Sequence, residues 1–141
     1  MKVNEIMTRD VEVATARDSV QGTAKKMRDH DIGFLPIYEG DQLIGVLTDR
    51  DLTLRALANG TSPQTFLGRS VITSPAVFCY EDQNVEDAAR LMQYNQIRRL
   101  VVLDRRDHLA GVLSMGDLAG TVDDKVSGKV LQSVSAKVRS V

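Results

Sequence analysis

The hydrophobic and polar positions of this chain follow two periods in turn, and the same order occurs in both halves. Apolar residues spaced by three and four, typical of one face of a helix, are followed by dense apolar runs separated by turns, typical of β-hairpins. A short β-prone segment precedes each helix. The predicted strands span residues 11–13, 32–38 and 43–47 in the first half and 76–80, 97–103 and 109–113 in the second.

Two helices in each half complete the pattern. The second begins directly after the hairpin, at Thr48 and at Ser114. The first follows a suitable N-cap, Asp18 or Ser19 in one half and Asn84 in the other. Its expected apolar face consists of Val20, Ala24 and Met27 in the first half and Val85, Ala88, Ala89 and Met92 in the second. The pattern thus predicts a β-α-β-β-α unit that is repeated once.

The repeat extends to individual residues. A shift of 65 residues superposes the first part of each half, and a shift of 66 superposes the hairpins, because one turn is a residue longer. Matched pairs include Thr8 with Thr73, Met27 with Met92, Gly45 with Gly111 and Asp51 with Asp117. We divide the chain into repeat 1 (1–58), a linker rich in turn-forming residues (59–70), repeat 2 (71–120) and a C-terminal tail (121–141).

The tail has the apolar spacing of a helix, but Gly128 and its serines make that helix weak unless it is packed. Two interpretations stay open: the helix packs on its own repeat, or it forms a contact between two copies of the chain. The apolar positions concerned are Val122, Val126, Val130, Leu131, Val134 and Val138.

Composition narrows the class of protein. The 141 residues have about the length of one domain, and 43% hydrophobic and 26% charged residues are ordinary for a globular protein. A formal net charge of −1 gives no general electrostatic reason to expect nucleic-acid or membrane partners. No apolar run approaches the ~18 residues of a membrane span, and the N-terminus lacks a signal peptide's apolar stretch, so we expect a cytoplasmic location. The single cysteine, Cys79, excludes an internal disulfide and is expected to be a small buried hydrophobe.

The strand-to-helix junctions carry the same short motif in both halves. Residues 45–51 and 111–117 each run Gly, two hydrophobic residues, Thr or Ser, two variable residues and Asp. The hydroxyl and the acid three residues later are close to a capping box, which would account for both residues as helix architecture. The same place, after the carboxyl end of a strand, is also where a carboxylate can hold ribose hydroxyls and free amides can meet a phosphate. The two interpretations are compatible.

Two such junctions in register with the whole β-α-β-β-α unit resemble a tandem pair of CBS (cystathionine-β-synthase-like) domains, also called a Bateman module. The resemblance covers residues 3 to 120 and is greatest to short stand-alone bacterial proteins of the mycobacterial hypoxic-response type. It implies an α+β fold in which the repeats pack as a pseudo-twofold pair. It also implies an adenosine-containing ligand in the cleft between the repeats, and a homodimer.

The resemblance assigns a role to each candidate site residue. Acidic residues would hold ribose hydroxyls, the capping hydroxyls would contact ribose or phosphate, arginines would reach phosphate, and residues before each first strand would contact the base from the opposite repeat. In that order the residues are Asp51 and Asp117; Thr48 and Ser114; Arg98 and Arg99, with Arg50 as a further basic candidate; Thr8 and Thr73; and Val11 and Ala76 flanking the adenine. Each position also has a structural interpretation, as a cap, a turn, a core residue or a solvated charge.

The two repeats differ where a phosphate would bind. Gly33 and Phe34 stand in the first repeat where Arg98 and Arg99 stand in the second. Guanidinium groups suit phosphate oxygens, so we expect one better site for phosphorylated ligands, the one with Asp117.

Catalysis has no support in the residue pattern. His30 and His108 lack partners at metal-ligand spacing, and no nucleophile elbow or P-loop occurs, so we expect neither an enzyme nor a metal site. Together with this lack, the resemblance to CBS domains implies a regulatory protein that senses AMP, ADP or ATP, has no obligatory cofactor and acts on an unidentified protein target. The alternative is a ligand-free protein–protein interaction or stress-response module.

Overall fold

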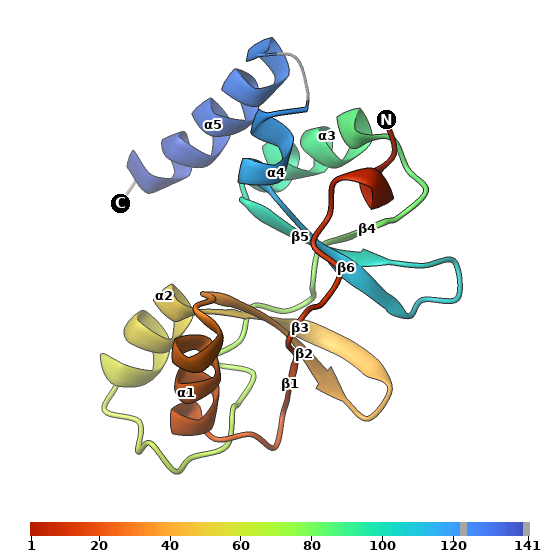
Figure 1. The fold of residues 1–141 in the computed structure, drawn as a ribbon. Helices are drawn as coiled ribbons and strands as arrows, with labels where there is room; N and C mark the ends of the chain where they lie inside the picture. The colour runs from red at the N-terminus through yellow and green to blue at the C-terminus, as the bar shows by residue number, and fades with distance from the viewer. Residues whose placement is uncertain (122–123, 140–141) are drawn as a thin grey trace. The chain divides into compact units, whose positions relative to one another are not determined.

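The computed structural model describes residues 1–121 and 124–139, which form two compact units. Unit 2 consists of Glu12–Ala76, and unit 1 combines Met1–Val11 with the chain from Val77 onward. Each unit contains a three-stranded sheet with helices packed on it (Figure 1). The predicted α+β class, with two β-α-β-β-α repeats and a C-terminal helix, is confirmed.

Unit 2 has the strand order β1-β2-β3. β1 pairs in parallel with β2, and β2 pairs antiparallel with β3 as a hairpin. Its elements are β1 (Ala14–Thr15), α1 (Val20–His30), β2 (Phe34–Glu39), β3 (Gln42–Thr48), α2 (Asp49–Asp51) and the π-helical turn η2 (Leu52–Leu57), which continues α2.

Unit 1 repeats this topology with the order β4-β5-β6, parallel and then antiparallel. It adds the short helix η1 at its beginning and α5 at its end. Its elements are η1 (Val3–Glu5), β4 (Phe78–Tyr80), α3 (Val85–Asn95), β5 (Arg99–Leu103), β6 (Leu109–Ser114), α4 (Met115–Ala119) and α5 (Asp124–Arg139).

The N-terminal segment is part of unit 1, next to the second repeat in space. The backbone amide of Val3 donates to Gln83 at 2.9 Å, and the amide of Val85 donates to the carbonyl of Met1 at 3.0 Å. Thr8 forms a β-bridge with Val112 of β6. The compact units therefore divide the chain differently from the sequence repeats at 1–58 and 71–120, because backbone pairing joins the first eleven residues to the far half.

The first strand of each half is shorter than its apolar pattern predicts. The prediction of a strand at 11–13 is wrong: β1 is Ala14–Thr15, because those two residues pair with Ile37 and Tyr38. The carboxylate of Asp18 accepts a hydrogen bond from the amide of Thr15 at 3.0 Å, which turns the chain toward α1.

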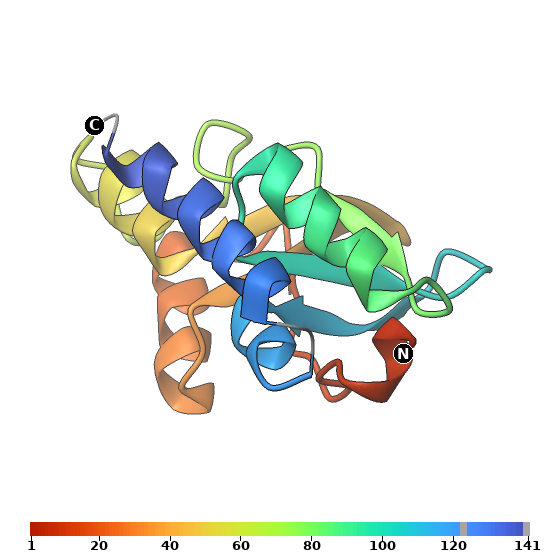
Figure 2. The ribbon, with the colours of Figure 1, turned by 90° about the horizontal axis from the view of Figure 1, so that it is seen from above.

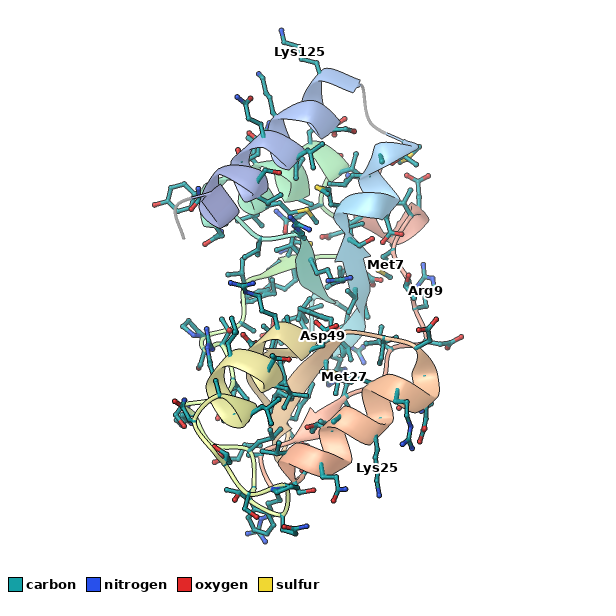
Figure 3. The ribbon with its side chains drawn as sticks, turned by 90° about the vertical axis from the view of Figure 1, so that its left-hand side faces the viewer. Met7, Arg9, Lys25, Met27, Asp49 and Lys125 are labelled. Atoms are coloured by element: carbon teal, nitrogen blue, oxygen red, sulfur yellow. The ribbon has the colours of Figure 1, made fainter. Side chains whose placement is uncertain are left out.

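Helix α1 begins after Ser19, whose side chain accepts a hydrogen bond from the amide of Gly22 at 2.9 Å. Met27 is buried as predicted, and Lys25 points away from the unit (Figure 3). The prediction that Ala24 belongs to the apolar face is wrong, since it is exposed. Thr23 lies on the buried face instead, where its hydroxyl donates to the carbonyl of Val20 at 2.9 Å.

Each unit has its own hydrophobic core between sheet and helices. In unit 2 the core joins Met27 of α1 to Leu35 and Leu47 of the hairpin and to Ala56 of η2. In unit 1 it includes Cys79, which is 1% exposed, as expected of a small hydrophobe. Burial raises the pKa of the Cys79 thiol to about 12, so the group stays protonated and unreactive at neutral pH.

The C-terminal helix α5 packs on its own unit, against α3 and α4 (Figures 1 and 2). Val130 and Val134 are buried, while Leu131 is exposed. Val122 and the side chain of Val138 lie outside the described residues. The interpretation of the tail as a helix that covers its own module is confirmed, and the dimer contact stays a prediction.

Replacing Val130 by Ala should lower the free energy of unfolding by about 2 kcal/mol, because it removes two methyl groups from a fully buried position and leaves a cavity. Leu131→Ala is the matched control on the same helix and should change it by less than about 0.5 kcal/mol. Urea unfolding followed by circular dichroism measures both. Equal effects of the two substitutions would contradict the packing of α5.

Candidate functional site

The candidate residues separate into two groups, and each group lies within one compact unit. We name each group after its acidic residue. The Asp51 site consists of Thr48, Arg50, Asp51, Thr73 and Ala76 in unit 2, and the Asp117 site consists of Thr8, Val11, Arg98, Arg99, Ser114 and Asp117 in unit 1.

Reciprocal capping fixes both acids. The hydroxyl of Thr48 accepts a hydrogen bond from the amide of Asp51 at 3.0 Å, and Oδ2 of Asp51 accepts one from the amide of Thr48 at 3.0 Å. Ser114 and Asp117 form the same pair at 3.1 and 2.9 Å. The predicted capping boxes are confirmed, and each uses only one of the two carboxylate oxygens, Oδ2.

A glycine on the adjacent strand lets the backbone of Thr73, and that of Thr8 in the other unit, approach closely. The amide of Val46 donates to the carbonyl of Thr73 at 2.9 Å, and the amide of Thr73 donates back at 2.8 Å. A Cβ atom on Gly45 would lie 2.5 Å from that carbonyl oxygen, which only a glycine avoids. Gly111 meets the carbonyl oxygen of Thr8 in the same way and more closely.

The two acids differ in their surroundings. Asp51 is 8% exposed, and its Oδ2 also accepts a hydrogen bond from the hydroxyl of Thr73 at 3.4 Å. Nη1 of Arg55 donates to that hydroxyl at 3.1 Å and lies 3.7 Å from Oδ1 of Asp51. Nη1 also donates to the carbonyl of Ile72 at 3.1 Å. Arg55 thus ties the threonine segment to the acid.

Sequence reasoning missed Arg55. Its position four residues after Asp51 on one helix face was the available signal, since such pairs contact each other. In the other repeat its place is taken by Thr121, whose hydroxyl donates to the backbone carbonyl of Asp117 at 3.0 Å. Among the described residues, no arginine forms an ion pair with the Asp117 carboxylate.

The structure supports the alignment of Arg98 with Gly33. The carbonyl of Arg98 accepts a hydrogen bond from the amide of Met115 at 2.8 Å, and the carbonyl of Gly33 accepts one from the amide of Asp49 at 3.1 Å. Arg98 and Gly33 thus occupy equivalent places before the second helix. Arg98 and Arg99 are exposed, and within residues 1–121 and 124–139 neither guanidinium forms a hydrogen bond or an ion pair.

The structure links none of the remaining candidates, Arg50, Val11 and Ala76, to the acids by a side-chain hydrogen bond among the described residues. Arg50 is exposed, and its side chain makes no hydrogen bond to any described residue. Val11 and Ala76 are half-buried and follow Thr8 and Thr73 by three residues along the chain.

No group of three or more His, Cys, Asp and Glu side chains that could hold a metal ion occurs among the described residues. Within the same part of the chain, no helix is long and apolar enough to cross a bilayer. His30 faces Glu12, with 3.6 Å between Nδ1 and Oε1, and His108 faces Asp104 at 3.8 Å.

Comparison with known proteins gives matches over most of the chain. The sequence model of the family described as "CBS domain" matches residues 3–57 and 68–124. The chain is 34% identical over 134 residues to the CBS domain-containing protein YhcV of Bacillus subtilis, which covers 94% of each protein. It is 30% identical over 116 residues to Hypoxic response protein 1 of Mycobacterium tuberculosis, covering 82% of this chain and 80% of that protein.

Solved structures share the fold. A conserved CBS domain protein from Thermoplasma acidophilum has a TM-score of 0.84 at 22% identity, over 94% of this chain and 75% of that chain. The CBS domain pair of protein MJ0100 in complex with 5′-methylthioadenosine and S-adenosyl-L-methionine has a TM-score of 0.74 at 25% identity, over 85% and 94%. CBSX2 in complex with AMP has a TM-score of 0.69 at 27% identity, over 84% and 93%.

Replacing Gly111 by Ala should destabilise the protein by about 3 kcal/mol, because the new methyl group collides with the Thr8 carbonyl and breaks the bridge to Val112. Gly120→Ala is the control, since nothing lies within 4 Å of its Cβ position and its φ is −96°. Urea unfolding gives the energies, and amide hydrogen exchange at Val112 reports the bridge. Retained protection of Val112 in Gly111→Ala would contradict the close approach.

Proposed function

Because this chain belongs to the CBS domain family and carries two copies of the domain, we propose that it is a regulatory protein whose ligand is an adenosine-containing nucleotide: AMP, ADP or ATP. Similar CBS pairs in complex with AMP, and with 5′-methylthioadenosine and S-adenosyl-L-methionine, support this ligand class.

The observation that carries the proposal is the fixed carboxylate in each unit. The capping box holds Asp117 through Oδ2, so the orientation of the side chain is set before any ligand arrives. Oδ1 is not used by the cap, and a carboxylate so placed can accept the two hydroxyls of a ribose. In the proposal Ser114 contacts ribose or phosphate while it caps α4, and Thr8 and Val11 meet the base. Thr48, Asp51, Thr73 and Ala76 play the matching parts in unit 2.

We assign phosphorylated ligands chiefly to the Asp117 site. Arg98 and Arg99 carry exposed guanidinium groups at the start of β5, where Arg99 pairs with Ser114 of β6. Charge-assisted hydrogen bonds from two guanidinium groups to phosphate are among the strongest that a protein surface offers. Gly33 and Phe34 offer none of these donors in the other repeat.

Regulation follows if the ligand binds one conformation of the protein more tightly than another, since differential affinity shifts a conformational equilibrium. We propose a cytoplasmic homodimer that passes this shift to a protein target. In this proposal the site binds a small ligand and catalyses no reaction.

A ligand-free interaction module is the second candidate, and the Asp51 site favours it. There the carboxylate already meets Thr73 through Oδ2 and Arg55 near Oδ1, so its charge is compensated inside the unit. The same reasoning does not apply to Asp117.

Isothermal titration with AMP, ADP and ATP should show binding of at least one of them. Asp117→Ala should weaken that binding at least tenfold, since it removes a charged acceptor of ribose hydroxyls. Glu86→Ala removes a carboxylate from the exposed first turn of α3 in the same unit and should bind like the wild type. No binding of any nucleotide at millimolar concentration would sink the proposal.

The double variant Arg98→Gln, Arg99→Gln should weaken AMP binding by about tenfold or more and leave adenosine binding unchanged, because only phosphate needs the guanidinium groups. Arg106→Gln, an exposed arginine in the β5–β6 turn, is the control. Titrations at two salt concentrations measure the electrostatic part. A parallel loss of AMP and adenosine affinity would show that the arginines act on the fold and not on phosphate.

A further inference from the structure

The carboxylate of Asp49 lies where a side chain on Gly33, the counterpart of Arg98, would begin. Its carboxylate lies against the α-carbon of Gly33: Oδ2 is 2.8 Å from where a Cβ atom would be, and the three nearest atoms all belong to this one group. Asp49 is the first residue of α2 (Figure 3). The matching residues in unit 1 are Met115 and Arg98, joined by the same backbone hydrogen bond.

The negative charge of Asp49 is not compensated nearby. Its Oδ1 accepts a hydrogen bond from the backbone amide of Arg50 at 2.9 Å, and no described cation forms an ion pair with it. Arg50 does not take the role of Arg98, because it follows Asp49 directly in α2 and the side chains of consecutive helix residues point in different directions. Arg55 is already engaged with Thr73 and the Ile72 carbonyl.

The two sites therefore differ in sign at one equivalent point. Among the described residues, the Asp117 site has two guanidinium groups without an ion pair there, and the Asp51 site has the carboxylate of Asp49, likewise without an ion pair, next to Gly33. A phosphate dianion beside a carboxylate is repelled, and in water-like surroundings this repulsion amounts to about a tenfold change in affinity.

We propose that the Asp51 site selects an adenine nucleoside whose 5′ substituent carries no negative charge, and that Asp49 is the residue that excludes 5′-phosphates. This rests on the proposed function, because it takes the 5′ group to lie where Arg98 and Arg99 lie in the Asp117 site. The two sites then bind chemically different ligands, a nucleotide in unit 1 and an uncharged or cationic nucleoside in unit 2.

The test measures the affinities of adenosine and AMP, which differ only in the phosphate. Both are titrated into the full chain carrying Asp117→Ala. This background leaves the Asp51 site intact, and circular dichroism checks its fold. Adenosine should bind at least about tenfold more tightly than AMP. Asp49→Asn, which keeps the acceptor oxygen for the Arg50 amide, should raise AMP affinity about tenfold and leave adenosine affinity unchanged.

Asp41→Asn is the matched control: it removes the same charge from an exposed turn at the other end of the β2–β3 hairpin and should leave the preference as it is. The double variant Gly33→Arg, Asp49→Met copies the Arg98 and Met115 arrangement, and it should prefer AMP. Removing the Asp49 carboxylate also makes room for the new side chain at residue 33.

The outcomes separate the two proposals. Equal affinity for adenosine and AMP in the Asp117→Ala background, unaltered by Asp49→Asn, overturns the role of Asp49 alone. Binding of neither compound in that background, with AMP still bound by the wild type, overturns the nucleoside assignment of the Asp51 site alone. No binding of adenosine or AMP to the wild type contradicts the proposed function itself.

Discussion

The close contact between a threonine carbonyl and a glycine on the neighbouring strand is the constraint on which both sites depend. At Gly45 and at Gly111 the backbone of the threonine segment lies where any side chain would be. Two reciprocal hydrogen bonds hold each segment in place, Thr73 with Val46 and Thr8 with Val112. In unit 2 this contact brings Thr73 beside the capped acid Asp51. Gly45 and Gly111 are therefore needed for the close packing of the backbone and not to form a turn.

In each repeat the same carboxylate caps a helix and belongs to the candidate site. This explains why the backbone structure of the two repeats is alike while the chemistry of their sites differs. Capping needs only Oδ2 and one backbone amide, which Asp51 and Asp117 both have. What distinguishes the sites comes from neighbours that capping does not constrain. Arg55 replaces Thr121, and Asp49 replaces Met115, without any change in the backbone hydrogen bonds at the junction.

The sequence predicts the features that local chemistry determines. The two hairpins, the caps at Thr48 and Ser114 and the apolar face around Met92 follow from spacing and from capping residues, and all are present. The roles of the candidate residues in binding stay predictions. Features that depend on distant contacts were missed or misplaced. Thr23, not Ala24, lies on the buried face of α1, where its hydroxyl donates to the carbonyl of Val20. Arg55 contacts a segment that ends at Thr73, 18 residues away.

The division of the chain into its units has a consequence for how the protein is made. Unit 2 is one continuous stretch, Glu12–Ala76, inserted between the two parts of unit 1. During synthesis on a ribosome, unit 2 is complete once Ala76 has emerged. The apolar side chains of Val3 and Met7 belong to the core of unit 1, so their burial requires the chain from Val77 onward. Translation thus completes unit 2 before unit 1, although unit 1 contains the earlier residues.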